Sequence, residues 1–303
     1  MERIRRCAAG LVFWVGVGVF GVLLDGGGAW AQTGAGSGRA VVYPVPTTGE
    51  ASRFQVPQVR LADAAVARRI DGFLLRRFRD EINEAVDSTA SPQRQVRQAA
   101  RLCCYDEETK TWWVGGQGVT ATDYTVLLNQ NHVLSLGFSI SYNGSEEPGG
   151  AHLTFDLRTG RVLALADLVA DPPAQLGRRL QAAISRRLRD NIAQAVTDGN
   201  DSASIARMAW LYQIETWDTT PQRAYALDMA GSDENDPNNA ELLRLTDFAL
   251  ELDALLLYHP IGMSRADFEF LPDDTYTFPY GRVQPKGLLL PVAAAAGKRK
   301  PRR

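Results

Sequence analysis

The sequence predicts an α+β fold in which an antiparallel β-sheet packs against two or more amphipathic helices. Two observations support this prediction. Two long segments, 66–86 and 173–196, carry apolar residues at steps of three and four, which is the period of an amphipathic helix. Several shorter segments alternate apolar and polar residues and are separated by turns that contain Asn or Gly, which is typical of antiparallel strands.

The size and charge of the chain limit the classes of protein to which it can belong. The chain has 303 residues, of which 45% are hydrophobic, and a formal net charge of −2. This length favours one large domain or two small ones. Binding of nucleic acid requires a clearly basic face, which a nearly neutral composition does not indicate. We therefore expect no nucleic-acid partner.

The first 31 residues are typical of a signal peptide. Three arginines among the first six residues precede a nearly uncharged apolar run at 8–24, and an Ala-Trp-Ala triplet at 29–31 matches a signal-peptidase site. The alternative is a membrane anchor, but the run is short compared with the ~17–25 residues that a spanning helix needs. The sequence thus predicts export to the periplasm or the medium, with no transmembrane anchor after cleavage.

The remaining chain is predicted to consist of a lead-in, a domain and a tail. Residues 32–53 are rich in Gly, Ala, Ser and Thr and are predicted to be a flexible lead-in. Residues 54–292 are predicted to form one domain, and residues 293–303 a basic, disordered tail. An alternative division gives two subdomains, one from 54–100 with 101–200 and one from 201–292.

The first part of the domain is expected to begin with a strand at 54–61, interrupted by Pro57. A helix follows across 66–86, and Asp63 precedes it as a cap, because its carboxylate accepts hydrogen bonds from the free N–H groups of the first turn. A second, shorter helix is expected at 92–101. The arginines on the polar side of the first helix indicate a solvated face more than an anionic partner.

The middle of the domain is predicted to be an antiparallel meander. Its strands are expected at 124–129, 133–142, 152–157 and 162–163, with an Asn-rich turn at 129–132. In the strand 133–142 the apolar side chains point one way, and Ser135, Ser139 and Ser141 point the other way with a glycine between them. We expect the apolar face to be core. The polar face has small side chains, so we regard the three serines as candidate ligand contacts.

The last third of the domain is predicted to return to strands after two helices. The helices are expected at 173–196 and 204–216, followed by a polar loop at 228–240 and by strands at 248–252, 255–258, 268–270 and 276–278.

The Gly-Gly-Ala-His segment at 149–152 is the most conspicuous candidate site. His152, Thr154 and Asp156 share one face of a strand, but His152 and Asp156 lie about 13 Å apart along it, too far for a hydrogen bond. Zinc sites need three or four ligands, and the sequence has no such spacing. We expect no catalytic residue, metal or cofactor, and a structural role in which the two glycines permit a tight turn. The three polar residues remain candidate ligand contacts.

Two adjacent pairs of residues are further candidates. The Cα atoms of Cys103 and Cys104 are about 3.8 Å apart across a trans peptide, short of the usual ~4.4–6.8 Å of a disulfide. Buried thiols, a vicinal disulfide and cross-links to a second chain therefore all remain open. Trp112 and Trp113 point to opposite faces if they lie in a strand, so one ring can be exposed. We keep Trp113 as a candidate for stacking on a sugar ring.

The order of these segments resembles a known family. Gly-Gly-Ala-His at 149–152 is followed by Asp-Leu at 156–157, Thr-Gly at 159–160, Asp-Leu at 167–168 and, late in the chain, Phe-Pro-Tyr at 278–280. This arrangement resembles the extracytoplasmic domain shared by RsiV-type anti-sigma factors and PdaC-type polysaccharide deacetylases. The resemblance covers the whole predicted domain.

The resemblance implies an α+β domain that lies outside any catalytic or sigma-binding part. In the RsiV branch this domain recognises lysozyme, and in the PdaC branch it accompanies an enzyme that acts on peptidoglycan. We therefore expect an exported, non-catalytic binding protein of the bacterial cell envelope, with a lysozyme-type protein or a peptidoglycan fragment as partner. The alternatives are a small exported hydrolase of cell-wall glycan and a structural envelope protein joined through its cysteines.

Overall fold

The computed structural model describes residues 38–82, 86–112, 119–142, 149–214, 226–227, 242–243, 245–261 and 265–298. These residues all belong to one compact unit. The predicted signal peptide, the polar loop at 228–240 and the candidate residue Trp113 lie outside the described residues.

Helices α1 (Ala64–Ile82) and α2 (Pro92–Cys104) form a layer at one side of the unit. The carboxylate of Asp63 accepts hydrogen bonds from the N–H groups of Ala65 at 2.8 Å and Val66 at 3.2 Å, which confirms the predicted cap of α1. The hydroxyl of Ser91 caps α2 in the same way. α2 continues three residues beyond its predicted end and carries both cysteines.

The segment predicted as a flexible lead-in contains regular structure, which corrects that prediction. Strand β1 (Val41–Pro44) pairs antiparallel with β2 (Pro57–Arg60), and the 3₁₀ helix η1 (Gly49–Arg53) lies between them. The Gly- and Thr-rich composition concealed a run of β-branched and aromatic residues, which favours a strand. Ala40 and Val45, at its two ends, are buried.

The predicted meander is present as a four-stranded antiparallel sheet. It consists of β5 (Val119–Gln130), β6 (Val133–Tyr142), β7 (Gly149–Asp156) and β8 (Arg161–Val162), in that order. Asn131 and His132 connect β5 to β6 with φ values of 51° and 65°, the left-handed geometry of a tight hairpin turn. A small separate hairpin, β3 (Tyr105–Asp106) and β4 (Thr111–Trp112), follows α2.

The Gly-Gly pair does not form the predicted turn. Gly149 and Gly150 begin β7 and pair with Ile140 and Ser139 of β6. Positive φ occurs instead at Gly160, which turns β7 into β8.

The second sheet is three-stranded and antiparallel, with β12 at its centre. Its strands are β11 (Phe248–Leu250), β12 (Ala254–Tyr258) and β13 (Thr275–Pro279). The segment predicted as a strand at 268–270 belongs to the 3₁₀ helix η3 (Arg265–Phe270). Short strands β9 (Ala226–Leu227) and β10 (Leu242–Leu243) pair in parallel, and η4 (Tyr280–Arg282) follows β13.

The remaining α-helices share one hydrophobic core with the second sheet. They are α3 (Leu165–Leu168), α4 (Pro173–Thr197), α5 (Ser202–Leu211) and α6 (Leu289–Gly297). Helix α6 corrects the predicted start of the disordered tail at residue 293. Its Val292 is fully buried, and Ala293 and Ala296 pack against the core, so these apolar residues order the segment before the basic end.

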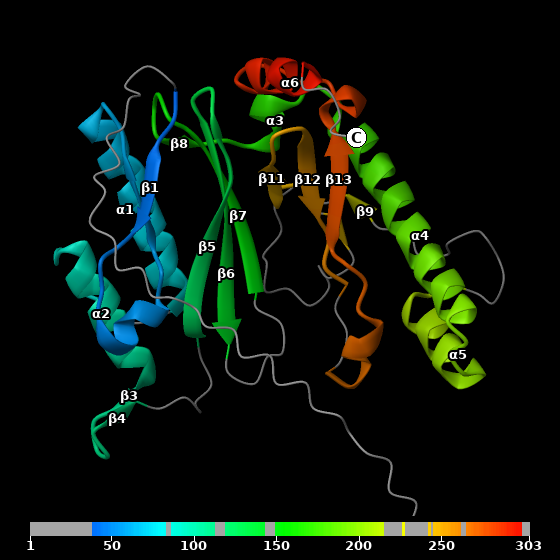
Figure 1. Ribbon diagram of the computed structural model, residues 1–303, viewed down its shortest axis with the longest axis horizontal. Coiled ribbons are helices and arrows are strands. Elements are labelled where there is room, and N and C mark those ends of the chain that lie inside the picture. Colours follow the sequence, from blue (N-terminus) through cyan, green and yellow to red (C-terminus); the bar gives the residue numbers. More distant parts are fainter. Residues whose placement is uncertain are drawn as a thin grey trace, which may run out of the picture. The chain divides into compact units, whose positions relative to one another are not determined.

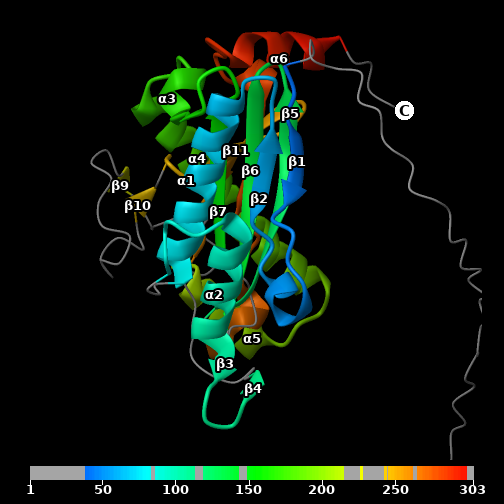
Figure 2. The same ribbon diagram turned by 90° about the vertical axis from the view of Figure 1, so that its left-hand side faces the viewer.

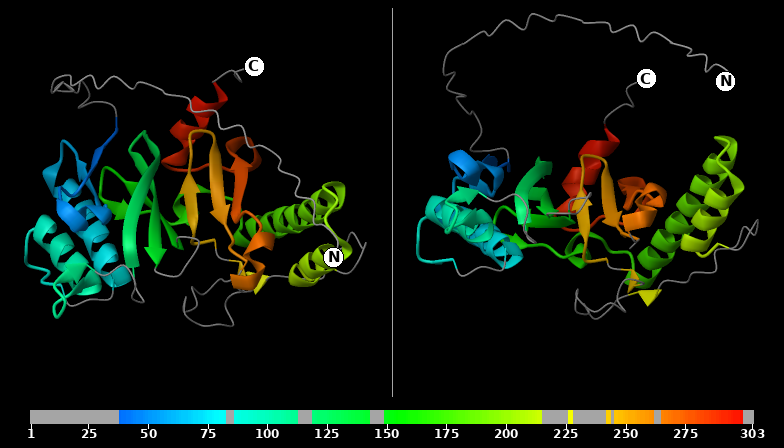
Figure 3. Two further views of the ribbon diagram at one scale, coloured as in Figure 1. Left: turned by 60° about the horizontal axis from the view of Figure 1, so that its bottom comes forward. Right: turned by 90° about the horizontal axis from the view of Figure 1, so that it is seen from below.

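The elements stack in layers, with the two sheets between two layers of helices (Figure 1). Helix α1 packs against the apolar face of β6 and β7, and Figure 2 shows α1 and α2 in front of the strands. Helix α4 packs against the outer face of the second sheet, and Figure 3 shows α4 and α5 on the side away from α1 and α2. The observed arrangement is the predicted α+β fold.

Candidate functional site

The polar face of the first sheet is covered by the second sheet. Ser135 is fully buried, and its hydroxyl lies 3.0 Å from the hydroxyl of Thr154 on β7. The same Ser135 oxygen accepts a hydrogen bond of 3.0 Å from the backbone N–H of Leu250 on β11. Because small side chains line this face, β11 approaches closely enough to form that bond. The face that the sequence suggested for a ligand is an internal interface, so Ser135 and Thr154 do not contact solvent.

His152 links the two sheets through a carboxylate and an aromatic ring. Its Nδ1 lies 2.7 Å from Oδ1 of Asp247, just before β11, and its ring stacks on Tyr258 of β12 with centroids 3.5 Å apart. On β6 the residue opposite His152 is Gly137. A Cβ at Gly137 would lie 3.5 Å from the imidazole, which is an ordinary van der Waals contact, so the ring packs directly beside this residue.

The electrostatics of this cluster keep the phenol of Tyr258 neutral. Burial, followed by the negative charge of Asp247, raises the pKa of Tyr258 well above its ordinary value. The side chain of His152 is 14% exposed and that of Asp247 is 35% exposed. The Asp247 carboxylate can hold the imidazole in one orientation, as acids do beside catalytic bases. The same contact equally serves to tie β7 to β11.

Asp156 has a structural partner of its own. Its two carboxylate oxygens accept hydrogen bonds of 3.0 and 3.1 Å from the guanidinium of Arg158, and its backbone oxygen accepts from Gly160. Burial acts to raise the pKa of Asp156, but the hydrogen bonds from Arg158 outweigh it and leave that pKa below the ordinary value. Asp156 is 5% exposed, so it stabilises the turn into β8 and is not presented to a ligand.

The other predicted site residues fall in different places. Ser139 and Ser141 are half-buried near the far end of β6, away from the Ser135 pair. Cys103 and Cys104 are joined to each other as a vicinal disulfide. Both sulfurs lie close to the backbone oxygen of Val119, at 3.1 and 3.4 Å. Paired in this way, the two cysteines have no thiol with which to cross-link a second chain.

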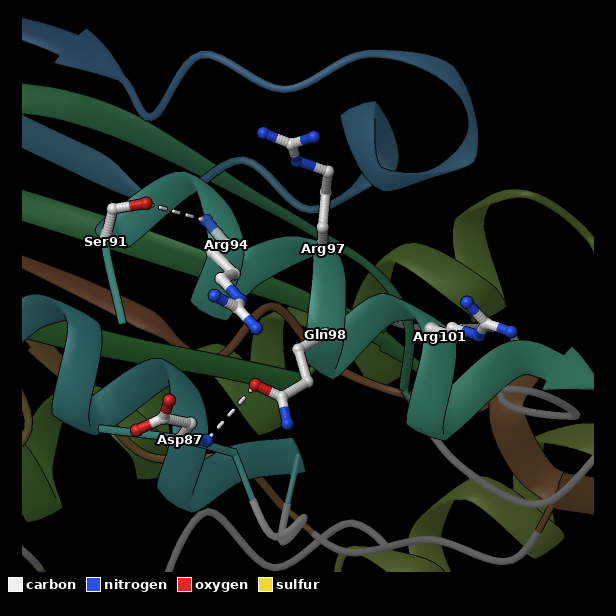
Figure 4. A pocket seen from close by; sticks show the side chains of 6 residues that line it. All are labelled: Asp87, Ser91, Arg94, Arg97, Gln98 and Arg101. Carbon is white, nitrogen blue, oxygen red and sulfur yellow. Dashed lines mark hydrogen bonds between the residues drawn. The ribbon is translucent and has the colours of Figure 1, made fainter. Parts of the chain in front are cut away.

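An open pocket on α2 is the most exposed candidate site. It has a volume of about 610 Å³ and is lined by Asp87, Ser91, Arg94, Arg97, Gln98 and Arg101. In Figure 4 the side chains of Arg94 and Gln98 point toward Asp87, Arg97 points away from it, and Arg101 lies one turn further along. The backbone N–H of Asp87 donates to the Gln98 side chain at 3.2 Å, which joins the two sides of the pocket.

The charges of this pocket are mainly positive and incompletely neutralised. Arg101 pairs with Glu107, but Arg94 and Arg97 form no ion pair with the described residues. The pKa of the single lining acid, Asp87, is lowered by hydrogen bonds from the Thr89 hydroxyl and N–H and by the charge of Arg94. Its carboxylate is therefore occupied by Thr89. The exposed guanidinium groups of Arg94 and Arg97, which point in different directions, each suit an anionic ligand, because guanidinium matches carboxylate and phosphate in shape and charge.

Neither a metal site nor a membrane span is found in the part of the chain that the structure describes. No group of three or more His, Cys, Asp or Glu side chains converges there. None of the described helices combines the length and apolar character needed to cross a bilayer.

The sequence did not reveal the contact between His152 and Asp247, nor the pocket on α2, and the reasons differ. Asp247 lies 95 residues from His152, and no local pattern connects them. The arginines at 94, 97 and 101 did carry a signal. Their spacing of three and four places them on one side of a helix, and the segment was already predicted to be helical.

Comparisons with known proteins do not identify a family for this chain. No protein-family model matches the chain, and no curated protein matches it. A solved structure of a DUF3298 family member from Bacteroides fragilis is 12% identical, with a TM-score of 0.46, and covers 81% of this chain and 88% of its own. A DUF3298 family protein from Pseudomonas aeruginosa is 14% identical, with a TM-score of 0.41, and covers 82% and 93%. The resemblance to the RsiV and PdaC families stays a prediction from the sequence.

Proposed function

We propose that this protein is an exported, non-catalytic binding protein of the bacterial cell envelope and that it recognises an acidic glycan, in particular a peptidoglycan fragment. The observation that carries the proposal is the pocket on α2, where Arg94 and Arg97 are exposed and form no salt bridge with the described residues. Peptidoglycan fragments carry carboxylates on both their sugar and their peptide parts. Each carboxylate is a suitable ligand for a guanidinium.

Two sequence features support the proposal. The basic and apolar N-terminal pattern favours export, and the order of motifs resembles a domain associated with peptidoglycan chemistry and lysozyme recognition. A disulfide between Cys103 and Cys104 also fits an oxidising compartment. A lysozyme-type protein is the alternative partner, and the binding experiment below distinguishes it.

The test is calorimetric titration of the exported chain with defined muropeptides and with lysozyme. Binding of the muropeptide should weaken about tenfold or more when Arg94 and Arg97 are both changed to Ser, because two charge-assisted contacts are lost. The matched control is the double change Arg68→Ser and Arg76→Ser, which removes the same charge from exposed positions of α1. Two results would refute the proposal. In the first, the two double variants bind the muropeptide with equal affinity. In the second, the wild type binds lysozyme but no muropeptide.

A hydrolase is the second candidate function, and one observation favours it. The 2.7 Å contact between His152 and Asp247 has the geometry in which an acid orients a general base. Tyr258 covers one face of that imidazole, and the ring is 14% exposed, which restricts access by a substrate. The hydrolase function would be established if the wild type cleaves cell-wall glycan and His152→Ala does not. Circular dichroism should show that the variant keeps its fold.

A further inference from the structure

The hairpin β3–β4 presents an aromatic pair beside the basic pocket. Trp112 is 37% exposed, and its ring meets that of Tyr105 edge to face with centroids 5.2 Å apart. Exposed tryptophans are useful in recognition because a large rigid ring offers contact area at little cost in conformational entropy. The pairing with Tyr105 holds the Trp112 ring in one orientation while part of it remains accessible.

The turn of this hairpin is held by its own side chains. The carboxylate of Asp106 accepts hydrogen bonds from the N–H groups of Glu108 and Thr109 and from the Thr109 hydroxyl. Glu107 pairs with Lys110 across the same turn. A recognition element that is ordered before binding loses less entropy when the ligand arrives. The hairpin therefore has the preorganisation that a binding surface needs.

Arg101 joins the hairpin to the pocket. It lines the pocket and its guanidinium lies 5.0 Å from the centroid of the Tyr105 ring. It also pairs with Glu107, but both side chains of this ion pair are more than half exposed, so the pair contributes little and a ligand carboxylate can replace it. Arg101 therefore connects the basic pocket to the aromatic pair through its contact with Tyr105.

We propose that Trp112 is the sugar-stacking subsite of this surface, so that a pyranose ring packs on the indole while an acidic substituent of the same saccharide reaches the arginines. The ligand class is an acidic oligosaccharide. The apolar face of a pyranose suits an exposed indole, and the substituent's negative charge suits Arg97 of the pocket. This inference rests on the proposed function, since it adds a second contact to the same site.

Two disaccharides that differ by one lactyl ether group, which carries a carboxylate, separate the two contacts. N-acetylglucosaminyl-N-acetylmuramic acid carries the acid, and di-N-acetylchitobiose is its neutral counterpart. Ligand-detected NMR titration of the full chain should give tighter binding of the acidic disaccharide. Trp112→Ala should weaken both ligands by roughly tenfold and leave their ratio unchanged. The variant with Arg94→Ser and Arg97→Ser should instead reduce that ratio toward one.

The matched control is Trp210→Ala on α5. Trp210 is 66% exposed and lies 4.6 Å from the guanidinium of Arg207, so it is also an exposed tryptophan beside an arginine. Trp112→Phe keeps an aromatic ring and should recover part of the affinity. This variant also controls for the case in which the hairpin does not fold in Trp112→Ala.

The possible failures are distinguishable. If the acidic disaccharide binds and is lost in the arginine variant, while Trp112→Ala behaves like Trp210→Ala, the stacking subsite is refuted and the proposed function stands. If the wild type binds neither disaccharide nor a larger muropeptide, the proposed function itself is refuted, and the subsite with it.

Discussion

Both faces of the β5–β8 sheet contain buried residues, but these are buried by different means. On one face, apolar side chains such as Leu134, Leu136 and Phe155 pack against α1. On the other face, Ser135, Thr154 and His152 meet the second sheet through hydrogen bonds and a stacked ring. The first interface depends on removal of apolar surface from water. The second depends on specific partners for polar groups that have lost water.

This difference shows that a polar strand face does not always face solvent. Small polar side chains protrude little from the sheet. The backbone of a second sheet can therefore approach closely enough to form hydrogen bonds with them. A polar interface of this kind gains less free energy from burial, but it defines the register between the sheets more strictly, because each buried donor needs its own acceptor. The following changes test the contrast, from the largest expected effect to the smallest.

Leu136→Ala should reduce the free energy of unfolding by about 2–5 kcal/mol, because a fully buried side chain on the apolar face leaves a cavity. Urea denaturation followed by circular dichroism measures the loss. Leu102→Ala, at a position that is 46% exposed, is the control and should change stability by less than about 0.5 kcal/mol. Equal losses in the two variants would show that α1 does not pack on this face.

Ser135→Ala should cost about 1–3 kcal/mol, because it leaves the buried N–H of Leu250 without its acceptor. The same denaturation experiment applies, with Ser139→Ala as control on the same face of β6, where the serine is only half-buried. A fully tolerated Ser135→Ala would mean that β11 does not cover this face. The face would then be open, as the sequence suggested.

Asp247→Ala should destabilise by about 0.5–1.5 kcal/mol, since it removes one partly exposed hydrogen bond to His152. The control is Asp253→Ala, at an exposed position in the turn between β11 and β12. NMR signals of the His152 ring should also shift in the first variant alone. An unchanged imidazole environment would contradict the link between the sheets.

The smallest expected effect on stability is at Asp71, a partly buried carboxylate of α1. Asp71 of α1 accepts a hydrogen bond of 2.7 Å from the N–H of Val59, and burial, partly offset by this bond, raises its pKa to about 6. The folded state then holds the proton more tightly than the unfolded state, so the stability contribution is full at low pH and declines as pH rises from 3.8 to about 6.

Asp71→Asn keeps an acceptor for Val59 but cannot ionise. Melting temperatures measured between pH 4 and 7 should therefore fall with pH by roughly 1–3 °C more in the wild type than in the variant. Parallel pH profiles would indicate that the Asp71 carboxylate is well solvated.

Much of the fold could be predicted, because local patterns reflect local physics. The period of apolar residues located α1 and α4, and the Asn-rich turn located the β5–β6 hairpin. Predictions from composition were less accurate. The predicted flexible lead-in contains β1, and the predicted start of the disordered tail lies inside α6. In both segments a few apolar residues pack into the core, and this packing outweighs an average composition that is typical of disorder.

The candidate site was predicted only in part. The arginines of α2 were visible as helical neighbours, but the pocket requires Asp87 from the connection before the helix. The partners of His152 come from the residue just before β11 and from β12, about a hundred residues later in the chain. No periodicity in one segment can report a contact of that separation.

The sequence by itself determined the α+β class, the antiparallel meander and the direction of side chains along each strand, since these follow from backbone geometry and from the apolar pattern of neighbouring residues. Only the tertiary structure decided which polar side chains remain exposed. It placed β11 over Ser135 and Thr154 and left Arg94, Arg97 and Trp112 at the surface. Exposure is a property of the packing between distant segments, and a polar residue is compatible with either outcome as long as it finds a partner.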